Sequence, residues 1–255
     1  LSVSDNYKKR FESYGWNFLE VNGHNEKQIS KAISKASKSN KPTLISCKTV
    51  IGFGSPNKSG KASSHGSPLG DDEIALVRKK LKWNNDPFKI PKEILDEWKK
   101  IGDRGQIIEK KWEESINKKS PEIKSELEKI YINSEHGELE KLIEKEKIKY
   151  FESKPSLATR QCSMAAIETI TAILPQLIGG SADLSGSNNT KTKSSKVISS
   201  KNFDGNYIHY GIREHGMAST MNGLALYGGL IPFGGTFLIF SDYCKPSIRL
   251  SALMG

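Results

Sequence analysis

The stretch at residues 206–243 reads NYIHYGIREHGMASTMNGLALYGGLIPFGGTFLIFSDY, and the rest of the chain is organised around it. Residues 207–210 have the β-branched and aromatic content of a short strand, which Gly211 interrupts. An apolar helix begins directly after this glycine and is predicted to end at the glycine pair 228–229. Glu214 therefore lies at the junction between a strand and a helix.

An aromatic segment follows, opened by the glycine pair 234–235. Phe237, Phe240 and Tyr243 stand at i, i+3 and i+6, which places three rings on one face of a helical segment. Alone, such a stripe is typical of a hydrophobic core, and the helix dipole favours any first-turn acid such as Glu214. Together, the carboxylate and the rings can bury a flat heteroaromatic ligand and hydrogen-bond its ring nitrogen.

The composition argues against membrane or nucleic-acid binding. The 255 residues contain no apolar run near 18 residues, and the first residues have neither the charged nor the apolar part of a signal peptide. Only 6 of the 39 basic residues are arginine, and a lysine-rich charge of +10 is typical of a solvated surface. A basic balance also suits an anionic substrate such as a sugar phosphate.

The cysteines indicate the compartment in which the protein works, and the chain ends indicate whether the sequence is a fragment. Cys47, Cys162 and Cys244 have no Cys-x-x-Cys spacing and no nearby histidine cluster, so neither a zinc site nor a disulfide framework is predicted. This pattern favours a reducing, cytoplasmic location. The chain lacks an initiator methionine and ends abruptly, so we expect an internal fragment of a longer protein.

The first 50 residues alternate between the two types of secondary structure, with helices predicted at 5–14 and 26–39 and strands at 16–21 and 43–50. Ser4 or Asp5 is the expected cap of the first helix, and Asn25 that of the second. The second strand is apolar on both faces, as in a buried parallel sheet. Such alternation predicts an α/β fold.

Residues 51–70 read IGFGSPNKSGKASSHGSPLG and predict a long loop, because they are rich in glycine, serine and proline. The loop leaves the carboxyl end of a predicted parallel strand, where α/β proteins bind ligands, although a mobile surface loop has the same composition. His65 is its only imidazole and lies where the backbone can approach a ligand. The acidic run 71–73 is expected to cap a helix that ends at Trp83.

The remaining segments differ from the first part. Residues 84–153 are rich in lysine and glutamate, with amphipathic patterns broken by proline and glycine, which predicts a linker of several helices. After a boundary at 154, we expect a helix at 159–174, a strand and polar turn at 177–183, and a loop at 184–200. The other histidines have structural interpretations; they are His24, His136, His209 and His215.

Several strings resemble transketolase, a family of thiamine-diphosphate enzymes, in the order that the family has them. They are GFGSPNK and SHGSPLG in the loop, ATRQCS at 158–163, GGSADLSGSN at 179–188, and GIREHGM and GGTFLIFSDY in the stretch at 206–243. The resemblance implies an α/β fold with parts of two thiamine-diphosphate-binding domains, whose parallel sheets are flanked by helices. The implied division is 1–83 for the C-terminal part of the diphosphate-binding domain, 84–153 for a helical linker, and 154–255 for the N-terminal part of the pyrimidine-binding domain.

The resemblance also implies roles for residues of the central stretch. Glu214 matches the catalytic glutamate, which hydrogen-bonds the N1′ nitrogen of the aminopyrimidine and needs a protonated carboxyl, a state that an apolar pocket favours. Phe240 matches the aromatic residue that stacks on the pyrimidine, with Phe237 and Tyr243 beside it. Asp183 is expected to help close the cofactor site.

The resemblance also implies roles for residues of the loop at 51–70 and for residues that bind the substrate. Ile51 and His65 match positions near the thiazolium and diphosphate, and His65 would also contact the donor ketose, so it joins Glu214 as a catalytic candidate. Arg160 and Ser187 match residues that hold the substrate phosphate. Members of the family often have a second histidine at the position of Ala62. The substrate contact of that histidine is therefore absent from this chain or is made from another position.

The implied activity is the reversible transfer of a two-carbon ketol group from a ketose phosphate to an aldose phosphate, in the pentose phosphate pathway. The implied cofactors are thiamine diphosphate and Mg²⁺, with the metal ligands upstream of this chain, and the implied assembly is a homodimer with shared active sites. This fragment alone would be inactive. Two alternatives stay open: a related ketol transferase such as dihydroxyacetone synthase, and a non-catalytic assembly module of the same fold. A 1-deoxyxylulose-5-phosphate synthase is disfavoured by the strings SPNK and SHGSPLG.

Overall fold

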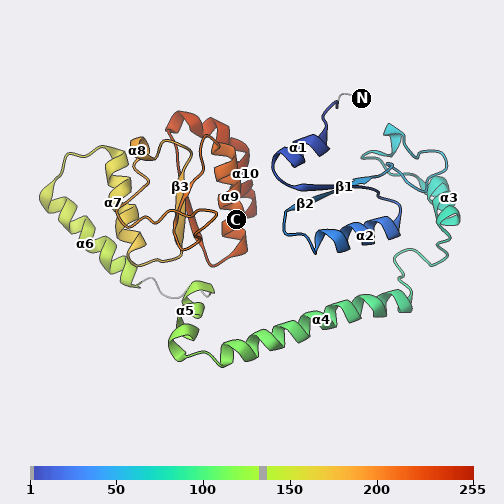
Figure 1. Cartoon of the computed structure of the whole chain (residues 1–255), viewed down its shortest axis with the longest axis horizontal. Coiled ribbons are helices and arrows are strands. Elements are labelled where there is room, and N and C mark those ends of the chain that lie inside the picture. Colours follow the sequence, from blue (N-terminus) through green and yellow to red (C-terminus); the bar gives the residue numbers. More distant parts are fainter. Residues whose placement is uncertain (1–2, 132–136) are drawn as a thin grey trace. The chain divides into compact units, whose positions relative to one another are not determined.

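The computed structural model describes residues 3–131 and 137–255 (Figure 1). The chain divides into two compact units, Leu1–Arg104 and Gly105–Gly255. Each unit contains a parallel sheet with helices packed against it, so the α/β fold expected from the sequence is confirmed. The division into three parts at 83 and 153 stays a prediction.

The first unit is built around two parallel strands. Its elements are α1 (Tyr7–Ser13), β1 (Asn17–Asn22), α2 (Glu26–Ala36), β2 (Thr43–Lys48), the 3₁₀ turn η1 (Ala62–Ser64) and α3 (Asp71–Leu81). The strands pair in register from Asn17–Thr43 to Asn22–Lys48. Strand β2 is half-buried or exposed rather than buried as expected, because among the described residues its sheet has two strands and each is an edge.

Asparagine side chains begin both early helices. Asn25 accepts a hydrogen bond from the backbone N–H of Gln28 at 3.0 Å, as expected for the cap of α2. The cap of α1 is Asn6, which accepts from the N–H of Lys9 at 2.9 Å. The expectation of Ser4 or Asp5 was therefore wrong, since α1 begins two residues later than the sequence pattern indicated.

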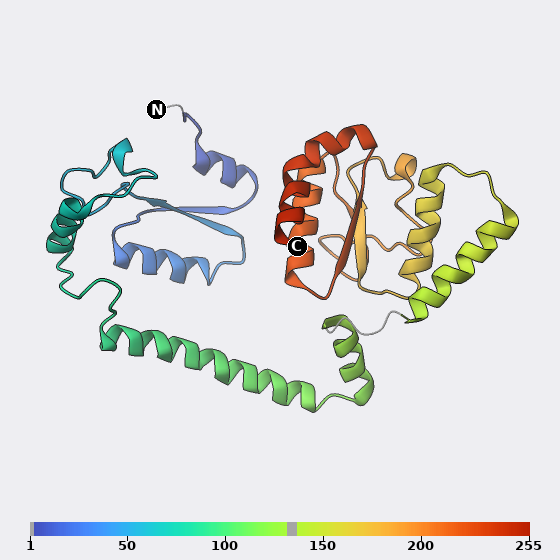
Figure 2. The same cartoon turned by 180° about the vertical axis from the view of Figure 1, so that it is seen from behind.

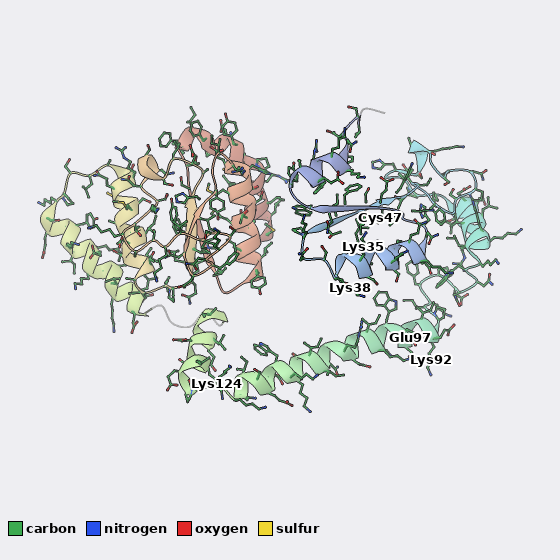
Figure 3. The ribbon with its side chains drawn as sticks, in the orientation of Figure 1. Lys35, Lys38, Cys47, Lys92, Glu97 and Lys124 are labelled. Atoms are coloured by element: carbon green, nitrogen blue, oxygen red, sulfur yellow. The ribbon has the colours of Figure 1, made fainter. Side chains whose placement is uncertain are left out.

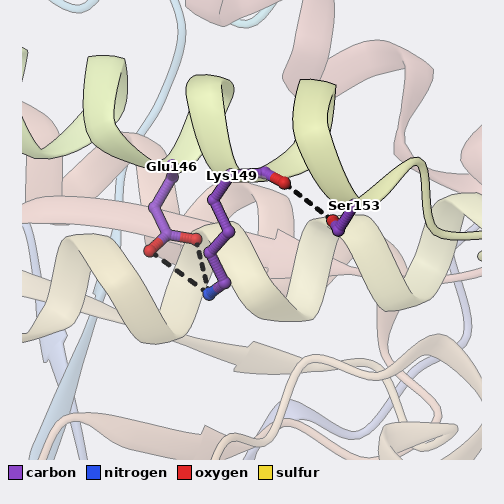
Figure 4. Close-up of polar contacts among 3 residues, drawn as sticks. All are labelled: Glu146, Lys149 and Ser153. Atoms are coloured by element: carbon purple, nitrogen blue, oxygen red, sulfur yellow. Dashed lines mark hydrogen bonds and ion pairs between the residues drawn. The ribbon is translucent and has the colours of Figure 1, made fainter.

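Three helices occupy much of the segment expected to form the linker. They are α4 (Lys92–Asn117), α5 (Pro121–Tyr131) and α6 (Gly137–Ser153). Charged side chains project from α4 and α5, as the labelled Lys92, Glu97 and Lys124 illustrate (Figure 3). On α6, Lys149 pairs with Glu146 at 3.1 Å (Figure 4). Such i,i+3 pairs support an exposed helix but contribute little energy individually. His136 lies outside the described residues.

The second unit has a three-stranded parallel sheet. Its further elements are α7 (Thr159–Thr171), β3 (Leu177–Ser181), α8 (Ser185–Asn188), β4 (Tyr207–His209), α9 (Glu214–Tyr227), β5 (Ile231–Gly235), the 3₁₀ helix η2 (Leu238–Cys244) and α10 (Lys245–Met254). The strand order is β4-β3-β5, with β3 in the centre. In both views α7 lies on one side of β3, and α9 with α10 on the other (Figures 1 and 2). Tyr207, Met217 and Cys244 are buried in this unit.

Two segments of this unit differ from the sequence expectation. Gly234 and Gly235 end β5 instead of opening the helical segment. The reason is close packing: a Cβ on Gly235 would lie 2.2 Å from a methyl group of Thr190, and one on Gly234 would lie 2.5 Å from the sulfur of Met221. Residues 184–200 are not only loop, since they contain the short helix α8.

Candidate functional site

The carboxyl ends of β3, β4 and β5 meet at one edge of the sheet, because all three strands are parallel. The segments that leave these ends carry most of the predicted site residues: Asp183 and Ser187 follow β3, Glu214 follows β4, and Phe237 follows β5. Ligands of open α/β sheets bind at this edge. The topology therefore brings residues 183–243 together although they are far apart in sequence.

Glu214 is the first residue of α9, directly after the turn at Gly211, whose φ is +69°. Its side chain is half-buried, and within residues 3–131 and 137–255 it makes no hydrogen bond or ion pair. Burial, and then the negative charge of Glu214, raise the pKa of the Cys244 thiol. Cys244 ends η2, so this effect places the carboxylate close to the aromatic segment, in agreement with the packing of α9 against η2.

The three aromatic rings form a continuous stack, as their spacing predicted. The Phe237 and Phe240 rings are 5.8 Å apart at 12°, and the Phe240 and Tyr243 rings are 6.1 Å apart at 29°. The segment is a 3₁₀ helix with three residues per turn, so positions i, i+3 and i+6 lie directly above one another. Phe237 and Tyr243 remain 40% and 63% exposed, which leaves ring surface open to a flat ligand.

A polar network fixes the segment after β3. The Ser181 hydroxyl accepts from the Asn188 amide at 2.6 Å, and Thr190 donates to Asn188 at 2.9 Å. The buried Tyr207 hydroxyl lies 2.9 Å from the Thr190 hydroxyl and donates to Ser185 at 2.9 Å. These bonds hold the short helix α8 against the end of β3.

The structure places the two predicted phosphate-binding residues on different elements. Ser187 lies exposed within α8, and Asp183, which has a left-handed φ of +68°, lies two residues before the start of this helix. Arg160 lies exposed in the first turn of α7, and in the described part of the chain its guanidinium makes no hydrogen bond or ion pair. A cavity of about 770 Å³ lies between these helices, but neither Arg160 nor Ser187 lines it; its lining includes Met164, Glu168, Ser185, Lys191 and Lys193.

The other predicted residues belong to the first unit. His65 is exposed and ends the 3₁₀ turn η1, where its N–H donates to the Ala62 carbonyl at 2.9 Å. Ile51 begins the loop, and its carbonyl accepts from the N–H of Gly60 at 2.8 Å. The loop is thus folded back on itself, with both candidate residues on its accessible surface.

Sequence reasoning missed two residues that hold this loop. The cap of α3 is Gly70 rather than the acidic run, and the Glu73 carboxylate turns to the loop, where Ser55 and Asn57 donate to it. His24 accepts from the N–H of Val50 at 2.8 Å, so it binds the segment that leads into this loop as well as lying in the turn before α2. No signal in the sequence sets Glu73 apart from Asp71 and Asp72, because its hydrogen-bond donors lie 16 to 18 residues earlier in the chain.

His24 also stacks on the ring of Phe53, with 3.8 Å between centroids and 12° between planes. The turn after β1 is thereby joined to the start of the loop after β2. Two further histidines have partners within the second unit: His209 packs edge-on against Tyr207 at 5.1 Å, and His215 lies 3.1 Å from the Ser247 hydroxyl.

The described residues fit a flat, polar heteroaromatic group. The ring stack is partly open and the neighbouring carboxylate is unpaired. Two buried hydroxyls directly after β4 and β5, those of Tyr210 and Thr236, have no hydrogen-bond partner within the described ranges. Burial raises the pKa of Tyr210, so this hydroxyl stays a neutral donor at neutral pH.

Two negative findings concern the described residues. They contain no group of three or more histidine, cysteine, aspartate or glutamate side chains that could hold a metal ion. None of the described helices has both the length and the apolar character needed to span a bilayer.

Two segments of the chain match cofactor-binding domains of one class of enzyme. The family described as "Transketolase, thiamine diphosphate binding domain" matches residues 1–136, and "Transketolase, pyrimidine binding domain" matches residues 155–255. The class is therefore that of thiamine-diphosphate-binding α/β proteins. Since the first match alone spans more than half of the residues, the chain belongs to the transketolase family.

Individual transketolases match almost the whole of this chain. Transketolase 1 of Pasteurella multocida is 46% identical over 98% of this chain and 38% of its own length. The crystal structure of transketolase from Campylobacter jejuni matches with a TM-score of 0.84 at 36% identity, over 99% of this chain and 38% of that one. A Pichia stipitis transketolase in complex with sedoheptulose 7-phosphate matches with a TM-score of 0.83 at 32% identity, with the same coverage. The chain thus spans about two fifths of the length of these relatives.

Proposed function

We propose that the protein containing this chain is a transketolase, which transfers a two-carbon ketol group reversibly between a ketose phosphate and an aldose phosphate in the pentose phosphate pathway. The observation that carries the proposal is the unpaired, half-buried Glu214 beside the stack of Phe237, Phe240 and Tyr243. A carboxyl and an open aromatic face are the two features that an aminopyrimidine needs.

The proposed cofactor is thiamine diphosphate, which when bound supplies the carbanion chemistry. The protonated carboxyl of Glu214 donates a hydrogen bond to the N1′ nitrogen, and Phe240 stacks on the pyrimidine ring. Ile51 and His65 contact the thiazolium and the diphosphate. Asp183 helps to close the site. Mg²⁺ is the proposed metal, held by oxygen ligands from the part of the protein upstream of this chain.

Sugar phosphates are the proposed substrates. Arg160 has an unpaired guanidinium, whose planar fork suits a phosphate, and Ser187 adds a hydroxyl donor. His65 is the proposed contact to the donor ketose. The sedoheptulose 7-phosphate in the Pichia stipitis relative supports this class of substrate.

The proposed assembly is a cytoplasmic homodimer with shared active sites, in which each cofactor is held by the diphosphate-binding domain of one chain and the pyrimidine-binding domain of the other. The proposed division is 1–83, 84–153 and 154–255. Support comes from large apolar side chains left exposed on α9 and η2, such as Tyr227 at 81% and Leu238 at 89%.

The test is a two-substrate assay on the full-length gene product with thiamine diphosphate and Mg²⁺. We expect a ketose phosphate and an aldose phosphate to exchange two carbons, and Glu214→Gln to abolish most of this exchange. Cofactor binding without exchange between sugar phosphates would contradict the proposal and favour a related ketol transferase. A protein that binds no cofactor would instead be an assembly module.

A further inference from the structure

Glu73 differs from the other acids at the start of α3. Asp71 and Asp72 are exposed, whereas Glu73 is only 7% exposed. Its carboxylate accepts hydrogen bonds from the Ser55 hydroxyl, from the Asn57 N–H at 2.9 Å and from the Asn57 side-chain amide at 2.9 Å. Every one of these donors lies in the loop at 51–70, so a helix-borne charge holds the loop.

The carboxylate is ionised in this place. The Ser55 hydroxyl, the two donors of Asn57 and the charge of Lys58 together lower the pKa of Glu73 to about 2, against the opposing effect of burial. An ionised carboxylate offers acceptor sites only, which matches three donors. Replacing it by an amide would set an N–H₂ group against at least one of them.

The held segment is directly connected to both loop residues that we assign to the cofactor. Ser55 donates its N–H to the Gly52 carbonyl at 3.0 Å. Gly52 packs against Ser64, since a Cβ at Gly52 would lie 2.9 Å from the Ser64 hydroxyl. Gly52 follows Ile51 in the chain, and Ser64 precedes His65. A change in the backbone path of residues 55–57 would therefore shift both Ile51 and His65.

A second contact closes the loop at its other end. Lys58 donates its ammonium to the Leu69 carbonyl at 2.8 Å, and its own N–H bonds the Ser55 hydroxyl at 3.0 Å. Ser55, which is only 1% exposed, thus receives one bond and donates another at the centre of the loop. One buried carboxylate and the hydroxyl bound to it thus connect several of the hydrogen bonds that order the loop.

We propose that Glu73 is a positioning residue that holds the loop at 51–70 in the shape required for cofactor binding. The identity of that cofactor, thiamine diphosphate, rests on the proposed function. Glu73 does not touch the ligand in this account. It acts by keeping the loop in one conformation, so that little of the binding free energy is spent on ordering it.

The test uses the full-length gene product with Glu73→Gln, and Asp72→Asn as a matched control. Both variants remove one negative charge from the same turn of α3, but Asp72 is exposed and is not bonded to the loop. For Glu73→Gln we expect roughly tenfold weaker binding of magnesium–thiamine diphosphate by calorimetry, because the competent loop is populated about tenfold less. Turnover at saturating cofactor should change by less than about twofold, because the ordered loop is the same once the ligand is bound.

Limited trypsin digestion of the cofactor-free protein gives a readout that is independent of activity. Lys58 and Lys61 lie in the loop, and we expect cleavage there to become roughly tenfold faster in Glu73→Gln, since the competent loop is populated less. Asp72→Asn should be cleaved like the wild type. If Glu73→Gln fails to fold, Ser55→Ala removes a single donor and should show the same two effects to a smaller extent.

The outcomes separate this inference from the proposed function. Unchanged cofactor affinity and unchanged loop cleavage in Glu73→Gln would overturn the positioning role, as would an equal loss of affinity in Asp72→Asn. A wild-type protein that binds no thiamine diphosphate would overturn the proposed function. Faster loop cleavage in Glu73→Gln would in that case still support the loop-holding role, with a different ligand.

Discussion

Two glutamates of this chain illustrate how placement decides chemistry at the scale of single residues. Glu73 has its carboxylate occupied by three donors from one loop, which fixes it as an anion. Glu214 has no such partners within the described residues and stands beside open aromatic rings. A carboxylate with satisfied acceptors holds structure, and an unsatisfied one at a ligand-binding edge is available for a substrate or cofactor.

For Glu214→Gln in the full-length protein, we expect turnover to fall by at least about 100-fold, the scale of a lost general acid–base group. Cofactor affinity should change little, because the ring stack is intact. Steady-state kinetics and calorimetry measure the two quantities. Asp242→Asn is the control, as this exposed acid in η2 pairs with Lys245 at 2.8 Å and should be neutral. A variant of Glu214 with near-normal turnover would refute its assignment.

The pKa of Glu73 predicts an acid transition of the loop. The folded-state pKa of about 2 lies below the ordinary value of 4.5, so the carboxylate stabilises the loop fully above pH 4.5 and loses this effect as the pH falls toward 2. The backbone amide resonance of Asn57 should therefore titrate with a midpoint near pH 2. Asp72→Asn should keep this titration and Glu73→Gln should lose it. A midpoint near 4.5 in the wild type would contradict the hydrogen-bonding scheme.

The sequence was informative about single residues where local spacing decides the geometry. The positions of Phe237, Phe240 and Tyr243 predicted a shared face, and the stack confirms it. The roles of Glu73 and His24 could not be predicted in this way. Their partners lie 16 to 26 residues away, and the contacts exist only because the loop folds back across the strand ends.

At the scale of elements, the central strand β3 depends on having no side chains at two successive positions. A Cβ on Gly180 would lie 1.8 Å from the Ile208 carbonyl oxygen, and one on Gly179 would lie 2.2 Å from that of Phe233. Strands β4 and β5 can therefore approach β3 on both edges only if these positions stay glycine. This close approach brings the carboxyl ends of the three strands, and hence the site, together.

We expect Gly180→Ala to destabilise the second unit by at least about 1–3 kcal/mol, since the strand pair must separate to admit the methyl group. Gly223→Ala is the matched control, because Gly223 lies in α9 with no atom within 4 Å of an added Cβ. That change should be neutral or stabilise the helix by up to about 1 kcal/mol. Urea unfolding of both variants measures the difference, and equal stabilities would contradict the packing of β3.

The ring stack of η2 gives a second test at this scale. Phe240 is the middle ring and contacts both neighbours, so Phe240→Ala removes two ring pairs of about 0.5–1.5 kcal/mol each. We expect cofactor binding to weaken at least tenfold by calorimetry. Phe203→Ala, at an exposed ring outside the stack, should bind as the wild type does. Normal binding by Phe240→Ala would show that the stack does not hold the pyrimidine.

Element boundaries were predicted less well than element types. Gly234 and Gly235 were expected to break the chain, as glycines commonly do, yet they continue β5 because Thr190, Met217 and Met221 pack closely against them. Likewise, the short helix α8 lies in a stretch whose serines and asparagines indicated only loop. In both cases tertiary packing, which the sequence pattern does not display, decided the outcome.

At the scale of the whole molecule, the assigned residues fall into two compact units. The loop with Ile51 and His65 belongs to one unit, and Glu214 with the ring stack belongs to the other. Each family match also covers one set, at residues 1–136 and 155–255. A single cofactor has its pyrimidine and its diphosphate joined through one thiazolium, so both sets of residues must act on one cofactor molecule.

Complementation between two inactive chains tests this requirement most directly. His65→Ala and Glu214→Ala variants of the full-length protein are each expected to be inactive, and they are mixed under conditions of subunit exchange. With shared sites, a mixed dimer has one site in which both residues are intact, so we expect part of the ketol-transfer activity to return in proportion to the mixed species. If exchange is demonstrated by mass spectrometry and no activity returns, the two residues do not serve one cofactor across the dimer.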